Sequence, residues 1–176
     1  MHRAAPELRT ERLRLRAHRR DDADALIALW QDPVVVRHFG GQAMASEDTW
    51  NRLLRYMGHW AANGYGMWVV EEQATGARVG EVGLFEGRRG LGDRFDGAPE
   101  AGWVLLPAGH GKGYAREAMA AVLNWGECEH GFARSVCMID PANTPSIRTA
   151  EAIGYRPFGT AHYKGQELLL FERAKP

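Results

Sequence analysis

The chain has 176 residues, of which 45% are apolar and 25% are charged, as in ordinary globular domains. This length predicts a single domain spanning residues 1–176, large enough to bury an extended core. Lys plus Arg and Asp plus Glu both number 22, and a net charge of zero argues against a nucleic-acid binder. No stretch approaches the ~20 apolar residues of a membrane span, and residues 1–6 lack the apolar core of a signal peptide.

The cysteines and histidines indicate a reduced protein without a metal site. Cys128 and Cys137 form no C-x-x-C pair, so we expect free thiols rather than a disulfide or a metal pair, and hence a cytoplasmic protein. The seven histidines show no H-x-x-x-H or Cys/His grouping. The sequence therefore predicts no bound metal.

Hydrophobic periodicity and turn residues predict an α/β chain of about seven strands. The chain is expected to begin with a strand over 12–18, a helix capped by Asp21 or Asp22 and ended by Asp32-Pro33, and a helix capped by Ser46 and ended by Asn63-Gly64. An antiparallel hairpin of strands 67–72 and 78–85, a mobile loop over 87–99, a strand over 100–106 and a helix running to about Glu129 follow. The last expected elements are a strand over 135–139, a helix capped by Thr144 and ended by Gly154, and a closing hairpin of strands 157–163 and 167–171.

The most informative segment is residues 105–118, where an apolar strand leads through a glycine-rich turn directly into a helix. Because glycine has no Cβ, the N–H groups of such a turn can converge on an anion. The helix adds unpaired N-terminal donors and the positive end of its dipole. The segment therefore predicts a phosphate or pyrophosphate site, and the alternative is an ordinary strand-to-helix connection.

Two well-known phosphate loops do not fit this segment. A P-loop needs a hydroxyl residue after Gly111-Lys112 and a glycine at position 106, but Gly113 and Leu106 stand there. The G-x-G-x-x-G spacing of dinucleotide-binding proteins also fails from either Gly109 or Gly111.

The turn resembles a third motif, the R/Q-x-x-G-x-G/A turn with which GNAT N-acetyltransferases hold the pyrophosphate of coenzyme A. His110 stands where arginine or glutamine is usual. Asn143 to Ser146, followed by Ile153-Gly154-Tyr155, resembles the second GNAT signature at the expected separation. The segments 12–16 and 100–103 are most similar to the branch of ribosomal-protein N-terminal (RimJ/RimL-like) acetyltransferases.

This resemblance implies a single-domain GNAT fold, which is a mixed, strongly twisted sheet with helices on both faces. It also implies acetyl-CoA as the co-substrate. The residues expected to bind it are Leu105, Leu106, His110, Gly111, Lys112, Gly113, Tyr114, Ala115, Arg116 and Asn143. For Asn143 the alternative role is to shape the turn before its helix.

Acetyl transfer to an amine needs a base, oxyanion donors and an acid for the departing thiolate. Glu100, at the start of the strand before the glycine turn, is the candidate base, with a structural ion pair as the alternative role. Many GNAT proteins carry an acidic tyrosine where this chain has Ala150. Ser146 is the candidate substitute, unless its hydroxyl makes only a local bond. Phe39 and Trp103 are the expected acceptor-binding residues.

The function predicted from sequence is therefore transfer of an acetyl group from acetyl-CoA to a primary amine by direct attack in a ternary complex. The acceptor would be a protein N-terminus or a small-molecule amine, with no nucleic-acid or membrane partner. The chain would act as a monomer or homodimer. The alternatives are a non-catalytic acyl-CoA sensor and transfer of a longer acyl group.

Overall fold

The structure is a computed structural model that describes residues 4–176, so half of the N-terminal stretch 1–6 considered above lies outside the described residues. Eight strands form one sheet in the order β1-β2-β3-β4-β5-β6-β8-β7. Their bounds are β1 (Leu8–Arg9), β2 (Leu13–Arg16), β3 (Met67–Glu72), β4 (Arg78–Phe85), β5 (Glu100–Leu105), β6 (Arg134–Ile139), β7 (Arg156–Tyr163) and β8 (Gln166–Ala174). The sequence predicted about seven strands because the two-residue β1 carries no alternation of its own.

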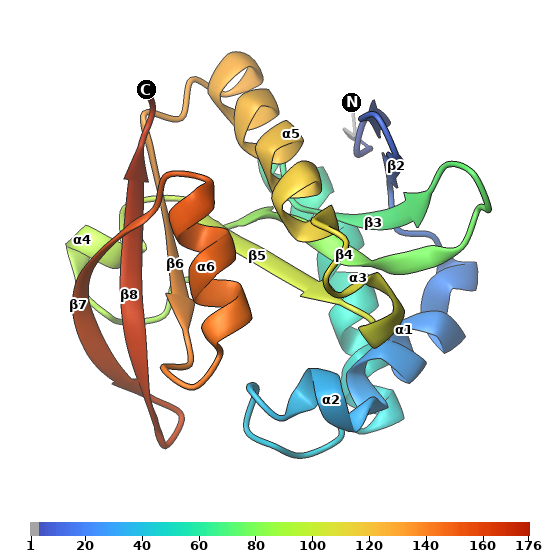
Figure 1. Cartoon of the computed structure of the whole chain (residues 1–176), viewed down its shortest axis with the longest axis horizontal. Helices are drawn as coiled ribbons and strands as arrows, with labels where there is room; N and C mark the ends of the chain where they lie inside the picture. The colour runs from blue at the N-terminus through green and yellow to red at the C-terminus, as the bar shows by residue number, and fades with distance from the viewer. Residues whose placement is uncertain (1–3) are drawn as a thin grey trace.

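Helices cover both faces of the sheet (Figure 1), as predicted. α5 and α6 lie on the face toward the viewer, and α1 and α3 lie behind it. The bounds are α1 (Ala23–Gln31), α2 (Pro33–Val36), α3 (Ser46–Asn63), α4 (Asp93–Asp96), α5 (Tyr114–Glu129) and α6 (Thr144–Ala152), with 3₁₀ turns at Arg20–Asp22 and Pro107–Gly109.

The sheet opens in its middle. All neighbouring strands pair antiparallel except β5 and β6, which run parallel and share the single paired position Glu100–Val136. Beyond that position the two strands diverge, as Figure 1 shows. The backbone edge of β5 over residues 101–105 is therefore not paired with β6, and the opening lies directly before the glycine turn.

Two large apolar clusters, one on each face of the sheet, build most of the core. α5 buries Met119, Val122 and Leu123 against β2, β3 and β4. On the other face α1 and α3 pack Leu29 and Leu53 against the sheet. Each such side chain contributes roughly 1.5–3 kcal/mol when it is removed from water, so the core holds the strands that carry the opening.

The loop predicted over residues 87–99 contains the short helix α4. Phe95 on this helix is 2% exposed and packs with Val136 and Leu170. The Asp96 carboxylate accepts hydrogen bonds from the backbone N–H groups of Arg89 and Leu91, the latter at 2.6 Å. The burial of Phe95 and the hydrogen bonds to Asp96 thus hold in place a segment that its glycines and charges predicted to be mobile.

Two helix caps differ from the prediction by one residue. The residue that caps α3 is Ala45, and Ser46 is the first helical residue. Asn143, not Thr144, caps α6, and its side-chain oxygen accepts from the Ser146 N–H at 3.3 Å. Asn143 therefore shapes the turn before its helix, which was the alternative role considered for it.

Candidate active site

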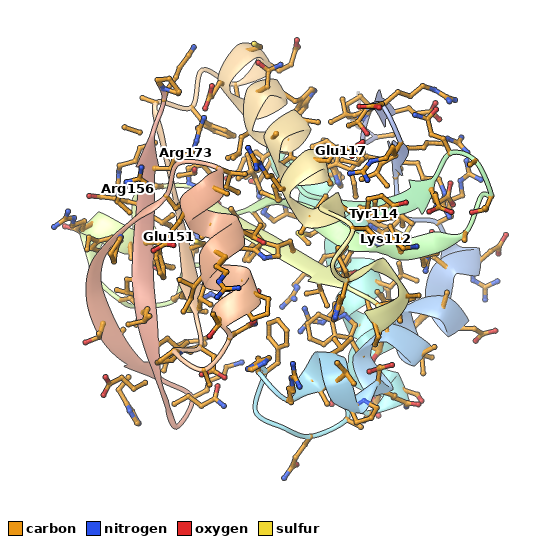
Figure 2. The ribbon with its side chains drawn as sticks, in the orientation of Figure 1. Lys112, Tyr114, Glu117, Glu151, Arg156 and Arg173 are labelled. Atoms are coloured by element: carbon orange, nitrogen blue, oxygen red, sulfur yellow. The ribbon has the colours of Figure 1, made fainter. Side chains whose placement is uncertain are left out.

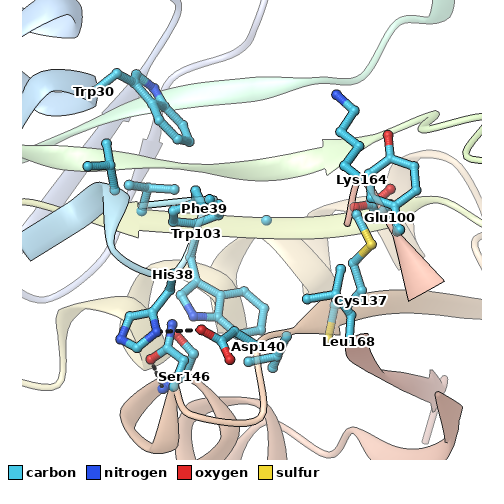
Figure 3. Close-up of a pocket in the computed structure, with 18 of the residues that line it drawn as sticks. Trp30, His38, Phe39, Glu100, Trp103, Cys137, Asp140, Ser146, Lys164 and Leu168 are labelled. Atoms are coloured by element: carbon cyan, nitrogen blue, oxygen red, sulfur yellow. Dashed lines mark hydrogen bonds and ion pairs between the residues drawn. The ribbon is translucent and has the colours of Figure 1, made fainter. Parts of the chain in front are cut away.

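Two cavities meet at the opening between β5 and β6. The cofactor cavity, as we name the one beside the glycine turn, has a volume of about 450 Å³. The acceptor cavity, on the side of α3 and the β7–β8 hairpin, has a volume of about 390 Å³. Both are lined by the same residues at their junction: His38, Phe39, Trp103, Val104, Asn143 and Ser146. Figure 3 shows Trp103, His38 and Ser146 gathered there, with Glu100 and Lys164 across the acceptor cavity.

The glycine turn presents a row of free donors to the cofactor cavity. Among residues 4–176, no backbone or side-chain acceptor binds the N–H groups of residues 111–116. Gly111 and Gly113 have φ angles of +72° and +77°, a region that other residues rarely adopt, and this conformation turns the chain into α5. Unpartnered N–H groups at a helix N-terminus fit a pyrophosphate.

Arg12 holds this turn from outside. Its Nη1 donates to the Lys112 carbonyl at 2.9 Å, its Nε donates to the Glu117 carboxylate at 2.7 Å, and its guanidinium carbon lies 4.7 Å from the centre of the Tyr114 ring. Glu117 also accepts from Thr10 Oγ1 at 2.5 Å and from the Arg12 N–H at 2.9 Å. Figure 2 labels Lys112, Tyr114 and Glu117 along this end of α5. The first turn of α5 is therefore fixed to the β1–β2 segment.

His110, the residue that departs from the motif, has its own partner. Its Nε2 lies 2.8 Å from the Leu105 carbonyl oxygen and closes the turn onto the end of β5. A side chain that stabilises the turn this way leaves anion binding to the backbone of the residues that follow.

The structure places most predicted cofactor residues around the cofactor cavity and two elsewhere. Leu106 packs with the cluster of α1 and α3, and the Lys112 ammonium lies 3.9 Å from Glu72. Those that line the cavity are Leu105, His110, Gly111, Gly113, Tyr114, Ala115, Arg116 and Asn143.

Glu100 lines the acceptor cavity but is bound by Arg89. The Arg89 Nε and Nη2 donate to its two oxygens at 2.8 and 2.9 Å, and Arg89 Nη1 donates to the Tyr163 hydroxyl at 3.0 Å. Burial raises the pKa of Glu100 above its usual value even though Arg89 opposes the shift. The ion pair that was the alternative role for Glu100 is thus present.

A second buried carboxylate, Glu81 on β4, was missed by the sequence reasoning. It is 1% exposed, and it accepts hydrogen bonds from the Tyr56 hydroxyl at 2.6 Å and from Trp30 Nε1 at 3.2 Å. His18 Nε2 lies 3.4 Å from its other oxygen. Burial alone would raise its pKa, but His18 and Tyr56 lower the pKa below the usual value. The available signal was a single acidic residue inside an otherwise apolar strand.

His38 and Asp140 join the two sides of the opening. His38 Nδ1 lies 2.8 Å from Asp140 Oδ2, and Arg37 Nε donates to His38 Nε2 at 3.0 Å. His38 follows α2 and Asp140 follows β6, so this contact spans the junction of the cavities. Figure 3 shows the contact beside Ser146. Sequence reasoning did not predict it, because the partners are 102 residues apart.

The two cavities bring backbone N–H donors close to buried carboxylates. Within residues 4–176 no three His, Cys, Asp or Glu side chains are grouped as metal ligands. In the same part of the chain, no helix has both the length and the apolar character needed to cross a bilayer.

Comparison with known proteins identifies the class. The model of the Acetyltransferase (GNAT) domain family matches residues 12–156, so the chain belongs to the GNAT acetyltransferases, as its motifs indicated. The chain is 31% identical to YkkB, an uncharacterized protein of Bacillus subtilis. The aligned region covers 97% of this chain and 96% of YkkB.

Solved structures agree with this assignment. A protein described as a GNAT-family acetyltransferase of Bordetella pertussis is 33% identical and superposes with a TM-score of 0.87, covering 97% of this chain and 100% of its own. The ribosomal-protein alpha-N-acetyltransferase RimL, solved with coenzyme A, is 15% identical with a TM-score of 0.78 over 96% of this chain and 98% of its own, and so shares the fold. The family's reaction is acyl transfer from an acyl-CoA to an amine.

Proposed function

We propose that this protein transfers the acetyl group of acetyl-CoA to a primary amine by direct attack in a ternary complex. The observation that carries the proposal is the junction of two cavities. One holds the unpartnered N–H groups of residues 111–116, and the other holds two buried carboxylates. Because the two cavities share lining residues at their junction, both substrates can bind side by side, with the thioester at the junction.

A cysteine acyl carrier is disfavoured. Cys137 lines the acceptor cavity, but burial and the neighbouring charge of Glu100 raise the pKa of its thiol well above its usual value. A protonated thiol is a poor nucleophile. Cys128 lies on the exposed surface of α5, away from both cavities. The amine nitrogen therefore forms the new bond to the acetyl carbon, and the coenzyme A thiolate leaves.

Two carboxylates compete for the role of base that removes the ammonium proton. Glu100 remains our first proposal, acting through water because Arg89 occupies both of its oxygens. Glu81 is the second, since its Oε2 accepts no hydrogen bond from the described residues. Ser146 at the junction is the proposed donor to the departing sulfur, and Phe39 and Trp103 are the proposed acceptor contacts. We further propose a single domain over residues 1–176, a cytoplasmic location and a monomer or homodimer.

Release of the coenzyme A thiol tests the reaction with N-terminal peptides, amino acids, polyamines and aminoglycosides as acceptors. We expect the base variant, Glu100→Gln or Glu81→Gln, to lower kcat by about 10²–10⁴-fold while acetyl-CoA binding persists. The other substitution serves as its matched control. If neither substitution lowers kcat, catalysis by these carboxylates is refuted.

The same assay separates the alternative functions. A sensor would gain thermal stability with acetyl-CoA but release no thiol with any amine. Faster release from succinyl-CoA than from acetyl-CoA would indicate a longer acyl group. No stabilisation by any acyl-CoA would refute the cofactor assignment.

A further inference from the structure

Apart from His38, three carboxylates and three cations line the acceptor cavity, namely Glu81, Glu100 and Asp140, and Arg52, Arg89 and Lys164. Two ion pairs line it, Arg89 with Glu100 and His38 with Asp140. Both pairs leave their carboxylates engaged, and the third carboxylate of the cavity wall, Glu81, is engaged by Tyr56 and Trp30. The cations that remain belong to α3 and to the turn between β7 and β8.

Arg52 on α3 is a cation held in place without an anionic partner. No carboxylate of residues 4–176 lies within ion-pair distance of its guanidinium, whose carbon lies 4.0 Å from the centre of the Trp30 ring. Its Nη1 donates to the Tyr56 hydroxyl at 3.1 Å, and Glu81 is linked to it only through that hydroxyl. Its Nη2 has no acceptor in the described part of the chain. A stacked guanidinium with a free donor is pre-ordered for a carboxylate.

One further unpaired cation lines the cavity, and another arginine lies beside Arg52 on α3. Lys164, at the tip of the closing hairpin, lines the same cavity and pairs with no acidic side chain among residues 4–176 (Figure 3). Arg55 lies about one helical turn from Arg52 on α3. Burial, together with the charges of Arg52 and Arg89, lowers the pKa of Arg55. Arg52 and Arg89 thus add to the effect of burial on Arg55, whereas the charge of Glu81 opposes it.

We infer that the acceptor is an amine that carries a carboxylate in the same molecule, and that Arg52 binds this carboxylate, with Lys164 adding attraction at the mouth. The inference rests on the proposed function, because it names the substrate class of that same site. A guanidinium and a carboxylate form parallel N–H···O bonds, whereas a polyamine would bring further positive charge to Arg52 and Lys164, the two cations of the cavity without an ion pair among residues 4–176. An amino acid satisfies this requirement, and so does a peptide with an acidic first residue.

Binding to the coenzyme A-loaded protein tests the inference without turnover. Isothermal titration compares unbranched amino acids H₂N–(CH₂)n–COOH of increasing length with their carboxamides, so that the spacing of amine and carboxylate is scanned. We expect the best acid to bind about tenfold more tightly than its amide, the effect of one charge-assisted contact. Peptides beginning with Glu or Gln form a second matched pair, which distinguishes a protein N-terminus from a free amino acid.

Variants assign the preference to Arg52. Arg52→Gln should remove the difference between acid and amide, Arg52→Lys should keep part of it, and Lys164→Asn should reduce it. Asparagine tolerates the positive φ of +49° at position 164. Arg20→Gln is the control, since Arg20 also faces a tryptophan ring, that of Trp50 at 5.9 Å, but lines neither cavity. Unchanged coenzyme A binding reports that each variant is folded.

The outcomes separate the two proposals. The inference is overturned if acid and amide bind equally well, if neither binds, or if spermidine binds more tightly than the acids. This comparison uses only the protein without substitutions. If amides are acetylated as fast as acids, the proposed function stands and the inference fails. If acids bind preferentially but no thiol is released, the inferred carboxylate site stands and acetyl transfer fails.

Discussion

At the scale of single residues, the buried charges are held by specific partners. Asp22 shows this outside the cavities, because Arg16 Nη1 and Nη2 donate to its two oxygens at 2.8 and 2.9 Å and Arg78 also pairs with it. Burial alone would raise its pKa, but Arg16, the Arg19 N–H and Arg78 lower it to about 2. This cluster joins β2, β4 and the start of α1.

This pKa predicts the acid sensitivity of the fold. A carboxylate whose pKa is lower in the folded state stabilises it above pH 4, and this contribution is lost as the pH falls toward 2. Asp22→Asn should therefore lower the free energy of unfolding by about 2 kcal/mol at pH 7 and much less near pH 2. Urea denaturation at both pH values measures this, with the exposed Asp24→Asn as control. An equal loss at both pH values would show that packing, not charge, is responsible.

At the scale of elements, the glycine turn and the first turn of α5 are held in place by the β1–β2 segment. Arg12 contacts the Lys112 carbonyl and Glu117, so its loss should loosen the turn without touching the acceptor cavity. For Arg12→Ala we expect the KM for acetyl-CoA to rise by about tenfold, with kcat and the amine KM nearly unchanged. Steady-state kinetics with each substrate varied in turn measure this.

Arg14→Ala is the matched control, because Arg14 lies two residues further along, on β2, and pairs with Glu7 and Glu71, away from the turn. A fall in kcat at saturating acetyl-CoA in the Arg12 variant would contradict a role limited to positioning the turn.

Elements with strong periodicity were predicted well, whereas contacts between distant segments were not. The bounds of β3, β4 and the end of α5 were predicted as observed, because turn residues such as Thr75-Gly76 bound the two strands and apolar residues repeat at helical spacing along α5. β1 and α4 are too short to show a period, and Phe95 anchors α4 only through contacts with β6 and β8. Glu81, Arg89 and the His38–Asp140 pair acquire their roles from partners in other elements, which local sequence does not specify.

At the scale of the whole molecule, the sheet consists of two parts that share one paired position in the ladder, Glu100–Val136. Residues 101–105 and the turn at 111–116 face the cavities from the first part, and α6 faces them from the second. A ligand at the junction would contact both.

We therefore expect acetyl-CoA to couple the two parts. It should raise the Tm with ligand concentration. It should also slow amide hydrogen exchange at residues 111–116 and at those N–H groups of residues 101–105 that point away from β4, because these groups gain partners. Mass spectrometry of exchange measures this, with β7 and β8, distant from the turn, as the internal reference. Uniform slowing across the chain would indicate stabilisation without local contact.

The divergence of β5 from β6 also bears on self-association. An unpaired strand edge is a template onto which another chain can add, and proteins usually blunt such edges with charge or proline at their surface. Here the unpaired edge of β5 lies in the middle of the sheet, and α5 and α6 lie over it in Figure 1. The two helices thus leave room for a narrow substrate but block the approach of a strand from another chain. The unpaired edge at the opening therefore does not make the protein prone to fibril formation.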